Sequence, residues 1–180
     1  MWRVVIVFVI ACGGRAPAVR EPAPSVKTEI EQAETAERAR KHDDARAHYE
    51  RAITIATDPA SSAYARREFA ETLASWGEVP QAIAQLEQSV QLVGDNAGAW
   101  HDLGILKHNL GDMPGATAAL ERAKTLAPED PRPRVALAAL RWKTGDRAGA
   151  TAEYKALLEL ELPDRLRAKV KWALDQLAKQ

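Results

Sequence analysis

Apolar side chains recur at helical spacing along most of the chain. Within residues 99–110 they fall three or four positions apart and mark one stripe of a helix: Trp100, Leu103, Leu106 and Leu110. Gly111 follows, and a glycine at this place can end a helix in the left-handed conformation. Asp112 is then a good N-cap for a second helix, whose first turn tolerates Pro114. The pattern predicts two helices joined by a tight turn.

This helix-turn-helix pattern returns every 34 residues. The turn glycines stand 34 residues apart, and each precedes an acid: Gly77-Glu78, Gly111-Asp112 and Gly145-Asp146. The size class of apolar positions is kept under the same shift, as where Leu103 falls on Leu137. A fixed period of this length indicates a stack of copied units.

The segment Ala97 to Asp130 carries the most complete copy of the pattern. It reads W-x2-L-G, then G-D, then A-x3-L, A and P, at Trp100, Leu103, Gly104, Gly111, Asp112, Ala116, Leu120, Ala123 and Pro128. It resembles the tetratricopeptide repeat, although Lys107 stands where that family usually has Tyr and Leu120 where it has an aromatic residue. The resemblance implies an all-α fold, a right-handed superhelical α-solenoid.

The register predicts four repeat units, at residues 26–59, 63–96, 97–130 and 131–164. In the first unit Arg40-Lys41-His42 replaces the turn of glycine and acid, so this copy is degenerate, and residues 60–62 are extra relative to the period. Residues 165–180 form a further amphipathic pattern with a basic outer side. Because the end of a solenoid needs a polar face, we expect a capping helix there.

Composition narrows the functional classes. The 180 residues carry no net charge, 46% of them are hydrophobic, and mean hydropathy is -0.34, which is ordinary for a folded domain. A nucleic-acid-binding protein would call for a basic face, so nucleic acid is not an expected partner. The acids Glu29, Glu31, Glu34 and Glu37 are predicted to form a solvated helix face.

The N-terminus differs in character from the repeats. Arg3 precedes the apolar run from Val4 to Ile10, and Val9-Ile10-Ala11-Cys12 resembles a bacterial lipobox. The resemblance implies a signal peptide at residues 1–11 and lipidation of Cys12, the only cysteine. Residues 12–25 contain three prolines and predict a semi-rigid tether. An ordinary secretory signal and a cytoplasmic protein remain alternatives.

Few residues suggest chemistry. His101 and His108 lie seven apart on one predicted helix face, without the cysteines or carboxylates that would complete a metal site. The sequence has no HExxH, CxxC, phosphate-binding glycine loop or GxSxG motif. We therefore expect no catalytic site, no metal and no cofactor.

Candidate binding residues come from the resemblance, because in tetratricopeptide proteins the first helix of each repeat lines a concave surface. The matching positions here are Tyr64, Arg67, Glu71, His101, Ile105, His108, Asn109, Arg132, Val135, Trp142 and Lys143. This mixture of aromatic, aliphatic and cationic groups favours a peptide that bears some acidic groups. One subclass of the family binds chaperone tails through a carboxylate clamp. The clamp is disfavoured here, since acids stand where it needs amides, at Glu71 and Asp102.

The sequence thus predicts a non-catalytic protein-interaction scaffold. The lipobox places it in the bacterial cell envelope, with the repeats in the periplasm, and Gly13 after the cysteine favours the outer membrane. Assembly of an envelope complex is the expected role. A self-associating structural or regulatory module is the alternative, and an enzyme or metal protein is the least favoured class.

Overall fold

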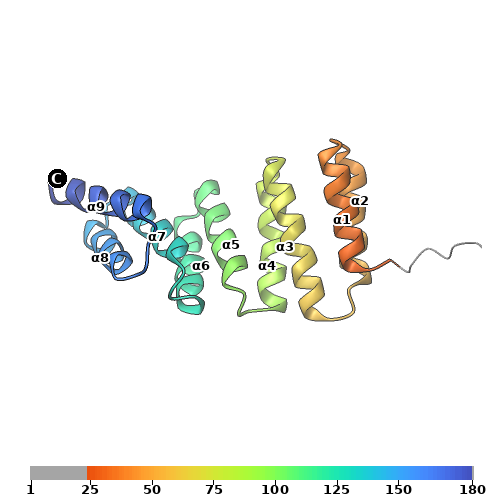
Figure 1. Ribbon diagram of the computed structural model, residues 1–180. Coiled ribbons are helices and arrows are strands. Elements are labelled where there is room, and N and C mark those ends of the chain that lie inside the picture. The colour runs from red at the N-terminus through yellow and green to blue at the C-terminus, as the bar shows by residue number, and fades with distance from the viewer. Residues whose placement is uncertain (1–23, 180) are drawn as a thin grey trace, which may run out of the picture.

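The computed structural model describes residues 24–179, so the predicted signal peptide, Cys12 and most of the tether lie outside it. The described part of the chain forms nine α-helices and no strand (Figure 1). They are α1 (Val26–Arg38), α2 (His42–Ile55), α3 (Pro59–Ser75), α4 (Val79–Leu92), α5 (Ala97–Leu110), α6 (Met113–Leu126), α7 (Pro131–Lys143), α8 (Arg147–Leu158) and α9 (Asp164–Lys179). None of these helices is long and apolar enough to cross a bilayer.

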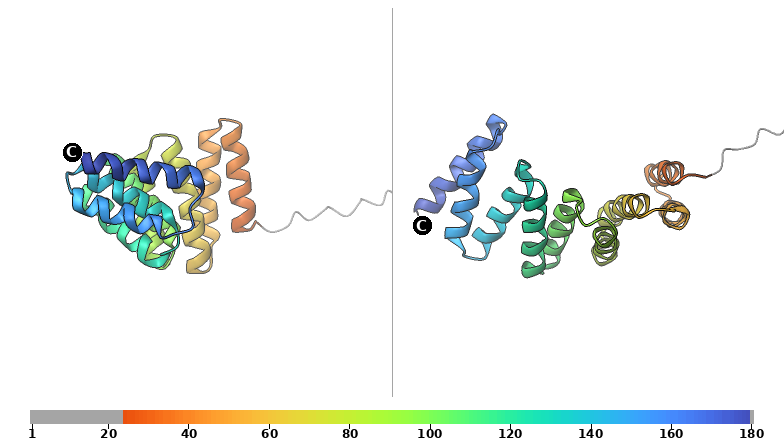
Figure 2. Two further views of the ribbon diagram at one scale, coloured as in Figure 1. Left: turned by 60° about the vertical axis from the view of Figure 1, so that its left-hand side comes forward. Right: turned by 90° about the horizontal axis from the view of Figure 1, so that it is seen from below.

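The helices pack as successive hairpins. α1 packs on α2, α3 on α4, α5 on α6 and α7 on α8, and each hairpin then contacts the next one along the chain. The stack is elongated and curved, with α1 at one end and α9 at the other (Figures 1 and 2). This arrangement confirms the predicted all-α repeat solenoid, whereas the hand of its superhelix stays a prediction.

Small residues let the two helices of a hairpin approach closely. Ala82, Ala116 and Ala150, which are one period apart, are fully buried between paired helices. At Gly104 the approach is closer still, because a Cβ atom there would lie only 2.6 Å from Cγ of Leu120. Larger side chains at these places would force the hairpin apart.

The turns within the hairpins repeat one backbone geometry. Gly77, Gly111 and Gly145 have φ angles of 82°, 90° and 86°, and the first hairpin uses Arg40 at φ 59° in the same way. The hydrogen bonds also match, because Lys41 N donates to Ala36 O over 2.9 Å just as Asp112 N donates to Lys107 O over 2.9 Å. The first unit is degenerate in sequence only, and its hairpin is fully formed.

The N-caps follow the sequence with one exception. Asp112 and Asp146 accept hydrogen bonds from Gly115 N and Gly149 N at 2.9 and 2.8 Å. Glu78 makes no capping bond to α4. Its carboxylate instead accepts from Arg46 at 2.8 and 2.9 Å, which links the first hairpin to the second.

The acidic face predicted on α1 is only partly solvated. Glu29 is buried at 7% exposure, where its carboxylate lies 2.7 Å from Nδ1 of His48 and accepts from Arg51 Nε at 3.1 Å. The hydrogen bond from His48 is the main reason that the pKa of Glu29 lies below its usual value. The prediction of a solvated face was wrong for this residue, because α2 covers it.

Candidate functional site

Three hollows adjoin one another along α1, α3, α5 and α7, the first helices of the four hairpins. The acidic hollow, between α1 and α3, has a volume of about 210 Å³. The central cleft, between α3 and α5, measures about 390 Å³, and the apolar slot, between α5 and α7, about 300 Å³. Glu71 lines both the acidic hollow and the central cleft, and Ile105 lines both the cleft and the slot. The hollows therefore adjoin one another in a row along the four hairpins, and we call this row the groove.

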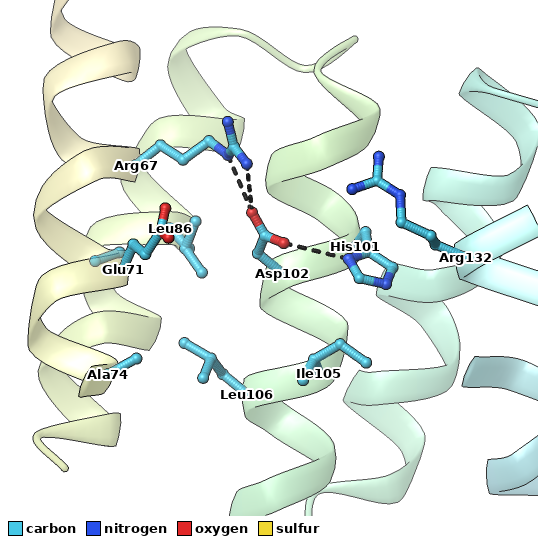
Figure 3. Close-up of a pocket in the computed structure, with 10 residues that line it drawn as sticks. Arg67, Glu71, Ala74, Leu86, His101, Asp102, Ile105, Leu106 and Arg132 are labelled. Atoms are coloured by element: carbon cyan, nitrogen blue, oxygen red, sulfur yellow. Dashed lines mark hydrogen bonds and ion pairs between the residues drawn. The ribbon is translucent and has the colours of Figure 1, made fainter. Parts of the chain in front are cut away.

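An ion pair crosses the central cleft. Arg67 on α3 donates to Oδ2 of Asp102 on α5 from Nε at 3.0 Å and from Nη2 at 2.9 Å (Figure 3). His101 Nδ1 lies 3.2 Å from the other carboxylate oxygen of Asp102. Burial alone would raise the pKa of Asp102, but the hydrogen bonds from His101 and Arg67 outweigh it and the pKa lies below its usual value. The positive charge of Arg67 is thus already paired with the carboxylate of Asp102.

The second arginine of the cleft is also engaged. Arg132 Nη2 donates to Oδ2 of Asp130 at 2.7 Å, and its Nε donates to both carboxylate oxygens at 3.0 and 3.1 Å. Asp130 is the N-cap of α7, and it also accepts from the backbone of Arg132 at 2.9 Å. The hydrogen bond from the Arg132 side chain is the main reason that the pKa of Asp130 is lowered. Neither arginine therefore offers a free cation to an acidic ligand.

The acidic hollow contrasts with the cleft, because no cation lines it. Its seven lining residues are Glu34, Glu37, Tyr49, Glu68, Glu71, Thr72 and Ser75. The side-chain carboxylates of Glu68 and Glu71 accept no hydrogen bond and form no ion pair with any described residue. Burial is the main reason that the pKa of Glu68 lies above its usual value, and the negative charges of Glu71 and Glu34 add to it against the pull of Arg67. This end of the groove therefore has a marked excess of negative charge.

The apolar slot has the opposite character. Its floor and walls are mostly aliphatic, from Ile105, Leu120, Ala136, Ala139 and Leu140. The alanines of α7 leave room for a side chain from outside, since Ala139 is exposed and Ala136 half-buried. Lys143 and His108 border the slot, with Lys143 Nζ 3.4 Å from His108 Nε2. An apolar side chain that packs against these aliphatic groups would gain about 25 cal/mol for each Å² of apolar surface removed from water.

Most of the predicted groove residues line these hollows. The predicted residues that line the central cleft are Arg67, Glu71, His101, Ile105 and Arg132. Those that line the slot are Ile105, His108, Asn109 and Lys143. Tyr64, near the start of α3, is 48% exposed and lines none of the three hollows.

Val135 and Trp142 lie elsewhere, although both were predicted to face the groove. They pack against the buried cluster that joins α7, α8 and α9. The Trp142 ring lies edge-on to Tyr154, with centroids 6.4 Å apart, and 6.5 Å from the ring of Trp172 on α9. The physical reason is that α8 and α9 follow α7 in the stack, and Trp142 packs against an aromatic ring of each.

The change of character along the groove is visible when equivalent positions of the four hairpins are compared. Six residues before each turn residue stand, in chain order, Glu34, Glu71, Ile105 and Ala139. Nine residues before it stand Glu31, Glu68, Asp102 and Ala136. At both positions the residue changes from acidic to apolar along the solenoid. Comparing the units position by position would have revealed this gradient.

No metal site is formed in the part of the chain that the structure covers. No group of three or more histidine, cysteine, aspartate or glutamate side chains there is placed to hold an ion. His101 instead contacts Asp102, and His108 lies beside Lys143.

Comparison with known protein families finds one match in this chain. A family model described as "Tetratricopeptide repeat" matches residues 97–130. Residues 97–130 are therefore similar to a tetratricopeptide repeat. The match falls on α5 and α6, the unit whose sequence carries the most complete pattern. A search of curated proteins finds no significant match.

Solved structures show the same fold at low sequence identity. MamA is 22% identical with a TM-score of 0.66, and the match covers 74% of this chain and 77% of MamA. PilW, described as a widely conserved type IV pilus biogenesis factor, is 18% identical with a TM-score of 0.68, over 86% of this chain and 70% of PilW. The first tetratricopeptide domain of Spaghetti (RPAP3), bound to the HSP90 peptide SRMEEVD, is 16% identical with a TM-score of 0.60, over 67% and 93% of the two chains.

Proposed function

We propose that this chain is a non-catalytic scaffold that binds a segment of another protein in the groove along α1, α3, α5 and α7. The observation that carries the proposal is the continuity of the three hollows, which share Glu71 and Ile105. Peptide recognition by helical repeats needs such an extended concave surface. The solved complex of Spaghetti with an HSP90 peptide gives a precedent for a peptide on this fold.

A substitution at Ala139 tests the proposal. Ala139 is exposed in the slot, so Ala139→Trp fills the slot without burying the new ring in the core. Ala118 on α6 is also exposed and lines none of the hollows, so Ala118→Trp is the matched control. Affinity isolation from an extract of the native cells should retain the same partners with the unaltered protein and the control, and lose them with Ala139→Trp. Equal retention by all three proteins would overturn the proposal.

We further propose that the scaffold is a lipoprotein of the cell envelope that assists assembly of an envelope complex. The support is the Val9-Ile10-Ala11-Cys12 sequence, which lies outside the described residues, together with the likeness in fold to a pilus biogenesis factor. Labelling of cells with radioactive palmitate should mark the protein, and Cys12→Ser should abolish the label. A label that survives this substitution would contradict lipidation at Cys12.

A further inference from the structure

The charge of the groove identifies the chemistry of its ligand. From the geometry we infer that the groove takes an extended peptide segment with Lys or Arg residues over repeats 1 and 2 and one apolar side chain in the slot between repeats 3 and 4. The inference rests on the proposed function and adds the class of partner. It also reverses the expectation from sequence, which was a peptide with acidic groups.

The charge left unpaired in the central cleft is negative. Both arginines of the cleft are paired, Arg67 with Asp102 at 2.9 Å and Arg132 with Asp130 at 2.7 Å, whereas Lys143 lies beside His108 at the far end of the groove. A ligand carboxylate would have to share each arginine with an aspartate that already pairs with it, and it would also meet the carboxylate of Glu71 in the same cleft. Because like charges at short range repel, an acidic segment such as the HSP90 peptide SRMEEVD does not fit this groove.

The acidic hollow is lined by four carboxylates. Glu68 and Glu71 form no ion pair with a described residue, although Arg67 lies near enough to attract Glu68, and the Glu37 carboxylate accepts from the hydroxyls of Thr72 and Ser75, both at 3.3 Å. Glu34 has one exposed neighbour, Arg38, at 3.6 Å. Folding therefore gathers negative charges that repel one another, and a cation from outside would relieve that repulsion.

The distance between the apolar slot and the acidic hollow determines the spacing of the matching residues in the ligand. Neighbouring helices lie roughly 10 Å apart and the two hollows are separated by two such spacings, so the slot between α5 and α7 lies about 20 Å from the hollow between α1 and α3. An extended peptide advances about 3.3 Å per residue. The apolar anchor and the cationic residues of the ligand should therefore stand about six or seven positions apart.

The probe for the test is a displayed library of random twelve-residue peptides, selected on the purified full chain. We expect the selected peptides to carry Lys or Arg and, six or seven positions away, an aliphatic or aromatic residue. Glu68→Gln with Glu71→Gln should weaken their binding about tenfold, which corresponds to about 1.4 kcal/mol. Raising the salt concentration should weaken it too, because exposed charges are screened.

Two controls separate charge in the groove from other effects. Glu50→Gln with Glu159→Gln removes two exposed charges that line none of the hollows, and binding should change less than twofold. The groove variant should melt at the same or a higher temperature than the parent. The reason is that burial raises the pKa of Glu68, so the charged form destabilises the folded state.

The outcomes distinguish this inference from the function on which it rests. If the selected peptides are acidic or uncharged but lose binding in Ala139→Trp, the groove binds peptides and the cationic ligand is wrong. If the selected peptides still bind Ala139→Trp, both the groove and the cationic ligand are wrong. The same conclusion follows if the selection enriches no peptide.

Two other occupants would also overturn the inference. A dimer by light scattering that Ala139→Trp dissociates would show a second copy in the groove. A more than tenfold gain in peptide affinity on Arg15→Glu with Arg20→Glu would show that the chain's own N-terminal segment occupies it.

Discussion

Replacing Arg40 by glycine should stabilise the protein, whereas most substitutions to glycine destabilise a fold. Arg40 is an exposed, left-handed residue at φ 59°, where the other three hairpins have glycine. A side chain in this conformation costs about 1–2 kcal/mol. Glycine avoids that cost but loses roughly 0.5–1 kcal/mol more conformational entropy on folding. Arg40→Gly should therefore stabilise the protein by about 0.5–1 kcal/mol.

The reverse substitution offers an internal control of equal size. A Cβ atom at Gly111 would meet no atom within 4 Å, so Gly111→Ala changes only the backbone preference. It should destabilise the protein by about 0.5–1 kcal/mol, for the same reasons with opposite sign. Gly77 and Gly145 have equally open surroundings and should behave alike.

Urea unfolding and hydrogen exchange measure the two effects. With a slope of about 2 kcal/mol/M, the midpoint should rise by roughly 0.2–0.5 M for Arg40→Gly and fall as much for Gly111→Ala. Because a terminal repeat can open alone, exchange of the α1 and α2 amides should also slow about two- to fivefold in Arg40→Gly. A lower midpoint, with faster exchange in these two helices, would refute the account of the turn.

Three further predictions concern single side chains. Leu137→Ala, at a fully buried position, should cost about 2–5 kcal/mol in urea unfolding, whereas a cost below about 1 kcal/mol would mean that α7 is not packed as described. Asp112→Ala should remove the N-cap of α6 at a cost of about 1 kcal/mol, measured the same way, and an unchanged midpoint would contradict the cap. The lowered pKa of Glu29 stabilises the fold above the usual value of 4.5, and this contribution is lost as the pH falls through the lower folded pKa. The parent should therefore lose more stability than Glu29→Gln between pH 6 and pH 3, and parallel pH profiles would exclude the contribution.

Much of the fold could be predicted because it depends on local signals. The turn glycines, the Asp112 and Asp146 caps and the apolar stripes are all readable within one repeat. The Arg40 turn was harder, since arginine gives no sign that it will adopt a left-handed conformation. Its place in the register, like that of Gly77, was the only available signal.

The candidate site was less predictable because it depends on contacts between repeats. The register identified Arg67 and Arg132 as groove residues, but whether their charges are available to a ligand depends on Asp102 and Asp130. Whether such neighbours pair follows from the curvature of the stack and from side-chain rotamers, which no short pattern encodes. For the same reason the packing of Trp142 against α9 was not foreseen.

The proposal that the groove is the binding surface can be tested by photo-crosslinking in cells. A photoreactive amino acid is placed at Ala139 in the apolar slot or, as the control, at Ala118 on α6. The account predicts that irradiation joins a partner to the protein from position 139 and not from position 118. Crosslinking from position 118 alone would place the partner outside the groove and contradict the account.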